Sequence, residues 1–194
     1  MTLAELRIAV KKYGLKELYD FLAQGVLQTS TPVNAVASEG IMTIGAQPTA
    51  TDIATIGGSD YLFVADGEEA DEGDISVGTD LATAKANILA AIAGSDSINT
   101  ANAEVTASAF STDESTLTAK VKGVAGDLIA TTSTFASGSN LFDGTTLGTE
   151  TAGVDGTVGV AGEGRFDASY EYRCIADNTI ADTNWRRFTL GSAY

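Results

Sequence analysis

The scarcity of large side chains is the feature that most limits what this chain can fold into. Of its 194 residues, 21 are glycine and only 7% are aromatic, and much of the apolar fraction is alanine and valine. Small side chains of this kind, together with abundant Thr and Ser, are typical of strands and tight turns around thin cores. We therefore expect a β-rich α+β fold, as one domain of ordinary size or as two small ones.

The distribution of charge limits the partners. The formal net charge is −15, and residues 29–150 carry seventeen acidic side chains against three basic ones, whereas residues 1–28 and 151–194 are close to neutral. An acidic surface repels phosphate, so we expect neither nucleic acid nor an anionic membrane as a partner. The sequence has no apolar run of about 18 residues and no signal-peptide pattern, which predicts a soluble protein made in a cytosol.

Residue types exclude several chemistries. Histidine is absent and Cys174 is the single cysteine, so an intrachain disulfide, a His/Cys zinc site and a nucleophile–histidine pair are all excluded. The glycine-rich segment 159–164 lacks the Lys-Ser/Thr and the following helix of a phosphate-binding loop. We expect Cys174 to be a small buried side chain. We also expect no catalytic residue, no metal and no cofactor, and therefore a protein that is not an enzyme.

Residues 1–28 predict a helical anchor, built as two short helices or as one kinked helix. Thr2 and Glu5 have the spacing of a capping box, and Gly14 breaks the phase between two apolar stripes. Short stripes need a partner, which is either the chain's own β domain, another protein or further copies of the chain. The stripe residues that we predict to bind a partner are Leu3, Leu6, Val10, Tyr13, Leu18, Tyr19 and Leu22.

After a linker at residues 29–39, residues 40–148 predict a small α+β domain that folds alone. Gly57-Gly58 predicts a two-residue hairpin that pairs residues 53–56 with residues 61–64. A helix capped by Thr79 or Asp80 and ended by Gly94 should cross one face of the sheet. Its expected buried stripe is Leu81, Ala84, Ile88, Ala91 and Ile92, and further strands are expected within residues 103–110, 116–123 and 126–133.

Six of the nine residues from Asp66 to Asp74 are acidic. Their order does not match a calcium-binding loop, in which acids alternate at set spacings and a bidentate Glu closes the site. The preferred interpretation is therefore a solvated loop tip, and a weak Ca²⁺ site is the alternative.

Residues 149–164 predict a Gly/Thr-rich connector, and residues 165–194 predict a small C-terminal β module with two strands. Its expected core consists of Tyr170, Tyr172, Trp185 and Phe188. The alternative is that some of these rings form an exposed face that binds a sugar or a partner.

Two parts of the sequence resemble modules of structural proteins from tailed bacteriophages. The first resemblance begins at the hairpin Ile56-Gly57-Gly58, with Tyr61 and Phe63. It continues through the helix and the strands that follow, where Asp127 stands in place of the usual Asn. The matching positions there are Asn87, Ala90, Ala91, Ile92, Gly94, Leu117, Thr118, Ala119, Lys120, Gly123, Gly126, Ile129 and Ala130.

The second resemblance is to a cap motif at the C-termini of phage head fibres, decoration proteins and tail appendages. The motif has the form G-x-x-R-x-D-x-S-Y-x-Y-x-C-x-A followed by W-K/R-R-x-x-L, and here it runs from Gly162 to Leu190. Together the two resemblances extend over about three quarters of the chain.

The resemblance implies a non-enzymatic structural protein of a phage virion, assembled in the host cytoplasm. The preferred reading is a capsid decoration or head-fibre protein that residues 1–28 anchor to the major capsid protein or to other virion proteins. The alternatives are a tail component (tube, fibre or baseplate subunit) and a module that binds a host-surface glycan. Because the middle of the chain is acidic, copies should associate through the near-neutral ends, and the threefold sites of shells favour a homotrimer. Arg186 and Arg187 are expected at the surface, where they can meet acids of a neighbouring copy.

Overall fold

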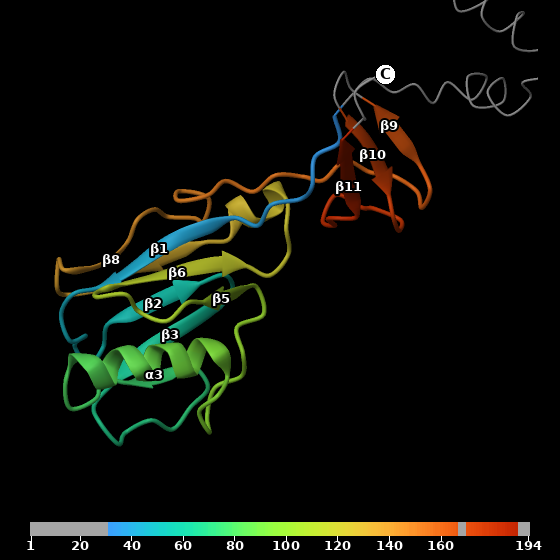
Figure 1. Ribbon diagram of the computed structural model, residues 1–194. Coiled ribbons are helices and arrows are strands. Elements are labelled where there is room, and N and C mark those ends of the chain that lie inside the picture. The colour runs from blue at the N-terminus through green and yellow to red at the C-terminus, as the bar shows by residue number, and fades with distance from the viewer. Residues whose placement is uncertain (1–30, 167–169, 190–194) are drawn as a thin grey trace, which may run out of the picture. The chain divides into compact units, whose positions relative to one another are not determined.

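The computed structural model describes residues 31–166 and 170–189, and Figure 1 shows the arrangement of their elements. The chain divides into two compact units. The central unit is Ala35–Asp155, and the C-terminal unit contains residue 156 onward together with the segment that precedes Ala35. The described residues form three sheets and one α-helix, which confirms a β-rich α+β fold. The helices predicted within residues 1–28 lie outside the described residues.

The central unit contains eight strands in two four-stranded sheets. The first sheet has the order β5-β6-β1-β8, formed by β1 (Glu39–Ile44), β5 (Val105–Ala107), β6 (Glu114–Ala119) and β8 (Asn140–Phe142). The second sheet has the order β4-β3-β2-β7, formed by β2 (Ile53–Ile56), β3 (Ser59–Val64), β4 (Asp74–Ser76) and β7 (Thr131–Ser133). Neighbouring strands are antiparallel, except that β3 and β4 are parallel.

Both sheets contribute to a single core between them. Successive strand side chains point to opposite faces, so every second residue of a strand is available to the core. Met42 and Ile44 of β1 are buried in this way, as are Tyr61 and Phe63 of β3. Ser115, Leu117 and Ala119 face inward from β6. The small side chains among them explain how a chain with few aromatic residues can fill this space.

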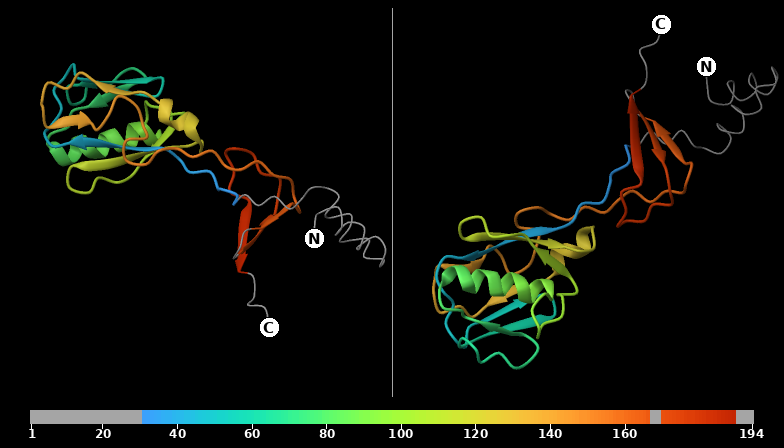
Figure 2. Two further views of the ribbon diagram at one scale, coloured as in Figure 1. Left: turned by 90° about the horizontal axis from the view of Figure 1, so that it is seen from above. Right: turned by 60° about the horizontal axis from the view of Figure 1, so that its bottom comes forward.

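Helix α3 (Leu81–Ala93) contacts β4 of one sheet and β5 of the other. The right-hand view of Figure 2 shows it beside both sheets, so it spans the two edges of the sandwich instead of crossing the face of one sheet. Its predicted ends are confirmed: the Asp80 carboxylate accepts a hydrogen bond from the Thr83 amide, and Gly94 ends the helix in the left-handed region. The predicted stripe is confirmed at Ala84, Ile88, Ala91 and Ile92, which are buried.

The hairpin of β2 and β3 turns at Gly57-Gly58, as predicted, and the φ angle of Gly57 is +64°. Its register differs from the expectation. Ile56 lies opposite Ser59 and Ile53 opposite Leu62, so the expected pairing with residues 61–64 was two residues too far along β3. The reason is geometric, because a two-residue turn places the residues that flank it directly opposite each other.

The boundaries of the central unit also differ from the expected ones. Val36 pairs with Val154 and Glu39 with Thr151 in antiparallel bridges, so parts of the expected linker and connector belong to the folded unit. The strand expected within residues 126–133 is divided into a 3₁₀ helix at Val124–Leu128 and β7. The two bridges, Val36–Val154 and Glu39–Thr151, join residues more than a hundred positions apart, and local sequence patterns do not reveal such pairs.

The C-terminal unit contains a three-stranded antiparallel sheet with the order β11-β10-β9. Its strands are β9 (Gly164–Phe166), β10 (Tyr170–Cys174) and β11 (Trp185–Thr189). The expected strands correspond to β10 and β11. Of the connector expected at residues 149–164, residues 156–164 belong to this unit.

Replacing Gly94 tests how the helix α3 ends. Both Gly94 (φ +62°) and Gly67 (φ +79°) have left-handed backbones, so alanine is strained at either position. A Cβ at Gly94 would lie 2.2 Å from the Ala101 amide nitrogen, whereas nothing lies within 4 Å at Gly67. We expect Gly94→Ala to lower the free energy of unfolding by about 3 kcal/mol and Gly67→Ala by about 1 kcal/mol, in urea titrations followed by far-UV circular dichroism. Equal losses would show that the contact with Ala101 does not hold the helix end.

Candidate interaction surface

The predicted partner-binding residues Leu3, Leu6, Val10, Tyr13, Leu18, Tyr19 and Leu22 lie outside the described residues. The structure therefore does not test whether these residues form one surface. Exposed polar and charged residues are described in the C-terminal unit and in the acidic loop of the central unit.

Arginine and aromatic side chains alternate on the packed face of the C-terminal sheet. The Arg165 guanidinium lies 4.9 Å from the ring centre of Trp185, and the Arg187 guanidinium lies 4.4 Å from that of Tyr170. Between them Tyr172 is buried, and its backbone pairs with Arg165 on one side and Arg187 on the other. Cation–π contacts of this kind stabilise a sheet that has few aliphatic side chains.

Trp185 is held by two irregular segments of the same unit. Its indole Nε1 donates to the Thr157 carbonyl at 2.7 Å, and Asn178 Nδ2 donates to the same oxygen at 2.7 Å. The Asn178 side-chain oxygen accepts from the Asn184 amide at 2.6 Å. Gly159 lies against the ring, since a Cβ there would be 2.5 Å from Trp185 Cζ2. The only tryptophan of the chain is thus a core residue, as predicted.

Cys174 lies beside Trp185 on this face and is buried. Its thiol donates to the Ala176 carbonyl at 2.8 Å. Burial raises the pKa of the Cys174 thiol above its ordinary value, which keeps it protonated at neutral pH. The prediction of a small buried side chain is confirmed.

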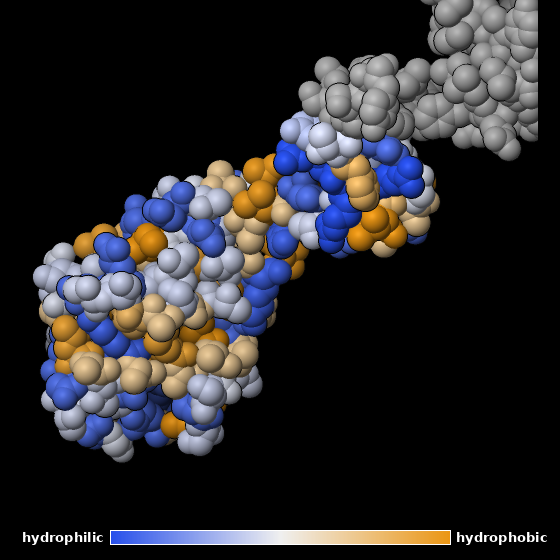
Figure 3. Space-filling view, in the orientation of Figure 1, coloured by the Kyte–Doolittle hydropathy of each residue, from blue (hydrophilic) through white to orange (hydrophobic). Residues whose placement is uncertain are grey.

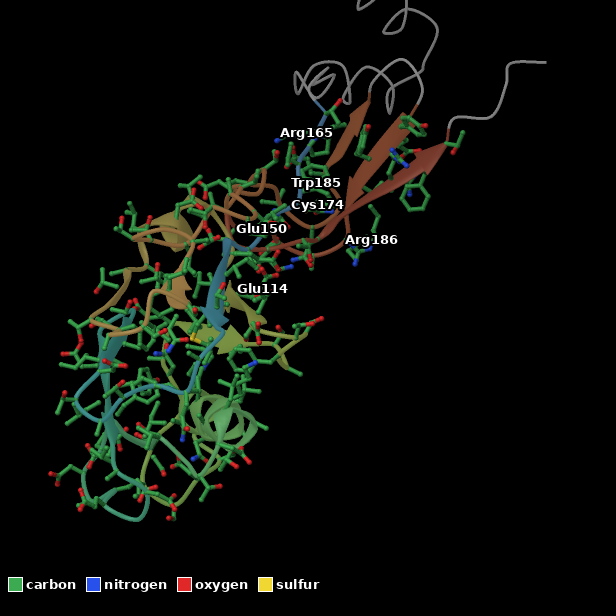
Figure 4. All side chains as sticks on the ribbon, turned by 90° about the vertical axis from the view of Figure 1, so that its left-hand side faces the viewer. Glu114, Glu150, Arg165, Cys174, Trp185 and Arg186 are labelled. Carbon is green, nitrogen blue, oxygen red and sulfur yellow. The ribbon has the colours of Figure 1, made fainter. Side chains whose placement is uncertain are left out.

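The opposite face of the C-terminal sheet is exposed, and its residues define the open face: Glu171, Arg173, Ile175, Arg186 and Phe188. Phe188 is 48% exposed and Ile175 is 55% exposed, so the prediction that Phe188 belongs to the core was wrong. Trp185 and Phe188 are three residues apart on one strand, and an odd spacing places two side chains on opposite faces. Figure 4 shows Arg186 pointing away from Trp185 and Cys174.

The charges of the open face are only partly paired within the described residues. Arg173 Nε contacts Glu171 Oε1 at 2.5 Å. Arg186 Nη1 donates to two main-chain oxygens, of Thr183 at 2.7 Å and of Trp185 at 3.2 Å, and contacts no described carboxylate. Figure 3 shows strongly hydrophilic and hydrophobic residues side by side on this unit. Such a mixed surface is typical of protein contacts.

The hydrogen bonds of the acidic loop Asp66–Asp74 fix its backbone and fasten it to neighbouring segments. Asp74 accepts from the amides of Ala70 and Asp71, and these bonds lower the pKa of the Asp74 carboxyl. Glu72 accepts from Thr100, and Asp66 accepts from Ser76. Across the part of the chain that the structure describes, no group of acidic side chains is arranged to hold a metal ion.

Residues that carry the phage resemblance mainly hold the fold. Asn87 Nδ2 donates to the Ser76 carbonyl at 3.1 Å and so fixes α3 to β4. Asp127 Oδ1 accepts from the Gly153 amide and from the Ser38 hydroxyl, each at 2.7 Å. These two bonds, that of Gly153 first, lower the pKa of the Asp127 carboxyl. The Asp in place of the usual Asn thus fastens the end of the central unit to its beginning.

Asn102 is a central residue that the sequence did not reveal. It is buried, and its Nδ2 donates to the Ile56 carbonyl at 3.0 Å and to the Tyr61 hydroxyl at 3.1 Å. Its Oδ1 accepts from the amides of Glu104 and Val105. Burial raises the pKa of the Tyr61 hydroxyl, which this contact with Asn102 partly opposes. A single Asn between two alanines gives no local signal for this role.

Comparison of the chain with known protein families, with curated proteins and with solved structures finds no match. Within the described residues, no helix is long and apolar enough to span a membrane. Function has to be inferred from the residues and their geometry.

Gly159→Ala tests the packing around Trp185. Because Trp185 is the only tryptophan, its fluorescence reports the C-terminal unit alone. The added methyl would meet the indole ring, so we expect a loss of about 2 kcal/mol in the unfolding followed by fluorescence. The circular dichroism transition of the central unit should not move. Gly162→Ala is the control, since it adds only the backbone strain of a φ of +86° and meets no atom within 4 Å. A shift no larger than that of this control would disprove the contact.

Asp127→Asn tests the link between Ser38 and Gly153. The folded-state pKa of Asp127 is lowered, so the stability from its ionised form is fully present above its unfolded pKa of about 3.9 and is lost as pH falls through the folded value. An amide oxygen can still accept both bonds but does not titrate. We expect Asp127→Asn to be about 1 kcal/mol less stable at pH 7 and to differ little at pH 2, by urea unfolding. Asp71→Asn, whose side chain accepts no described hydrogen bond, should show neither effect. A constant difference across this range would contradict the linkage.

Proposed function

We propose that this chain is a non-enzymatic structural protein of a tailed-phage virion, namely a capsid decoration or head-fibre protein. The observation that carries the proposal is the role of the residues that resemble phage modules. The hairpin glycines, the end of α3 at Gly94, Asp127 and Trp185 all take part in turns, hydrogen bonds or packing. The characteristic residues of this module serve to hold its own fold. A stable module of this kind is suited to display and attachment.

The way the central unit is joined to the rest of the chain supports this proposal. Its first and last residues are neighbours, because Val36 and Val154 pair in an antiparallel bridge with backbone bonds of 2.9 and 3.1 Å. Val33 and Thr157 are joined in the C-terminal unit by a backbone bond of 2.8 Å. The central unit is therefore an insertion with adjacent ends, an arrangement that lets a domain project while the rest of the chain is attached elsewhere.

The acidic charge gives the projecting unit a function of its own. Residues 29–150 have an excess of fourteen acidic side chains over basic ones. A surface of this kind keeps the protein in solution and disfavours direct contact between two central units. Attachment is then the task of the near-neutral residues 1–28, with the major capsid protein or another virion protein as the partner and a homotrimer as the assembly. A glycan-binding face is less well supported, because Tyr172 and Trp185 are buried.

Locating the chain in purified particles tests the proposal. Particles produced by a host that carries the gene are banded on a density gradient, analysed by mass spectrometry, and labelled with gold-conjugated antibodies raised against residues 35–155. A decoration or head-fibre protein should label heads, at a fixed ratio to the major capsid protein. Label confined to tails would support the tail alternative, and absence of the chain from particles would refute a virion role.

A triple variant tests the anchor. Leu6→Asp, Val10→Asp and Leu18→Asp place three carboxylates on the predicted stripes, and an unpaired charge is strongly disfavoured at a packed interface. We expect incorporation into particles to fall at least tenfold, while Trp185 fluorescence and the circular dichroism of both units remain unchanged.

The matched control makes three equivalent changes on the central unit. Val121, Val124 and Leu128 are exposed apolar residues, and replacing all three with Asp adds the same charge. This control should incorporate normally. Normal incorporation of the anchor variant would rule out residues 1–28 as the attachment, and loss in the control alone would assign attachment to the central unit.

A further inference from the structure

We propose that the open face of the C-terminal sheet binds the acidic loop Asp66–Asp74 of a second copy of this chain. The contact joins two different surfaces, so it repeats head to tail from copy to copy. It does not depend on the location of the protein in a virion, and it states which surfaces the expected homo-oligomer would use.

The open face has the composition of a binding surface. Phe188 and Ile175 offer apolar area at its two ends, and Arg173 and Arg186 lie between them and add charge. The Arg186 guanidinium reaches only main-chain oxygens among the described residues. A guanidinium keeps its charge at all relevant pH values and can hold a carboxylate through two parallel hydrogen bonds. The face therefore suits an acidic partner with some apolar surface.

The acidic loop offers carboxylates that have no other task. Glu68, Glu69 and Asp71 accept no hydrogen bond from a described side chain or amide, whereas the neighbouring acids fasten the loop. Because Asp66, Glu72 and Asp74 hold the backbone in place, little conformational freedom is lost when the three unengaged carboxylates meet a partner. Glu68 and Asp71 are also well exposed.

Charge favours a contact between an open face and an acidic loop over a contact between two loops or between two open faces. Two loops would bring six unengaged carboxylates together, and two open faces would bring four guanidinium groups together with only Glu171 of each copy to oppose them. Like charges placed opposite each other cost several kcal/mol, whereas face against loop joins opposite charges. A contact between unlike surfaces closes into a ring or continues as an open chain, and a ring of three would be the expected homotrimer.

The small area of the contact predicts a low affinity between copies. The open face consists of five residues on or next to the two strands β10 and β11, so its area is much smaller than the roughly 800 Å² per partner of a standard interface. The association should therefore be weak in dilute solution and become populated when copies are held at high local concentration. Concentration dependence is the property to measure.

Complementary charge reversals provide the test, using the full chain in sedimentation velocity over a wide range of protein concentrations. One variant is Arg186→Glu, and the other combines Glu68→Lys with Glu69→Lys. We expect wild-type protein to self-associate and each variant alone to associate at least tenfold more weakly. An equimolar mixture of the two variants should associate clearly more strongly than either variant alone, because a face of one variant then meets a loop of opposite charge on the other.

Matched controls separate this contact from general effects of charge. Lys122→Glu repeats the basic-to-acidic change, and Glu114→Lys with Glu150→Lys repeats the acidic-to-basic change at exposed positions, the latter two labelled in Figure 4. Both controls should associate like the wild type. If the fluorescence of Trp185 shows that Arg186→Glu disturbs the C-terminal unit, Arg173→Glu takes its place. A monomeric wild type at every concentration, a mixture that does not recover, or controls that weaken association equally would each overturn the proposal.

Discussion

Hydrogen bonds between the main chain and buried or half-buried Asn and Asp side chains are the interaction on which the rest of the structure depends. The cores are thin and much of the chain is irregular, so many amide and carbonyl groups have no strand or helix partner. Asn102 bonds three main-chain groups and the Tyr61 hydroxyl in the central unit, and Asn178 holds two irregular segments around Trp185. Asp127 joins the beginning and end of the central unit. A buried polar group left without a partner costs about 1–3 kcal/mol, so each of these side chains matters far beyond its size.

The two units solve the shortage of apolar area in different ways. In the central unit, α3 contacts the edge strands of both sheets, and a single core built mainly of aliphatic side chains is closed on that side. Among the described residues of the C-terminal unit, the buried cluster consists of Tyr172, Cys174 and Trp185. This unit gains further stability from guanidinium groups stacked on aromatic rings, above all Arg165 on Trp185. This economy explains why its second face is left free for other contacts.

Within each unit, the residues that hold the fold differ from those that are available for contacts. Of the two neighbouring arginines of β11, Arg187 stacks on Tyr170 and Arg186 faces away with no described carboxylate partner. In the acidic loop, Asp74 holds the backbone while Glu68 points to no described partner. Surfaces that the fold itself does not use are the ones available to a partner or to another copy, and here they carry opposite charges.

The sequence by itself determined the local features. The β-rich class followed from composition, and the limits of α3 and the turn at Gly57-Gly58 followed from capping and turn preferences that act within a few residues. Tertiary structure decided what depends on distant partners: the role of Asn102, the bridge between Val36 and Val154, and the packing of Gly159 under Trp185. The exposure of Phe188 lies between these cases, since strand alternation predicts that it faces away from Trp185, but only the fold shows which face is covered. The physical reason is the range of the interactions. The propensity of a residue for a helix, strand or turn depends on its neighbours in sequence, whereas its burial depends on the whole folded chain.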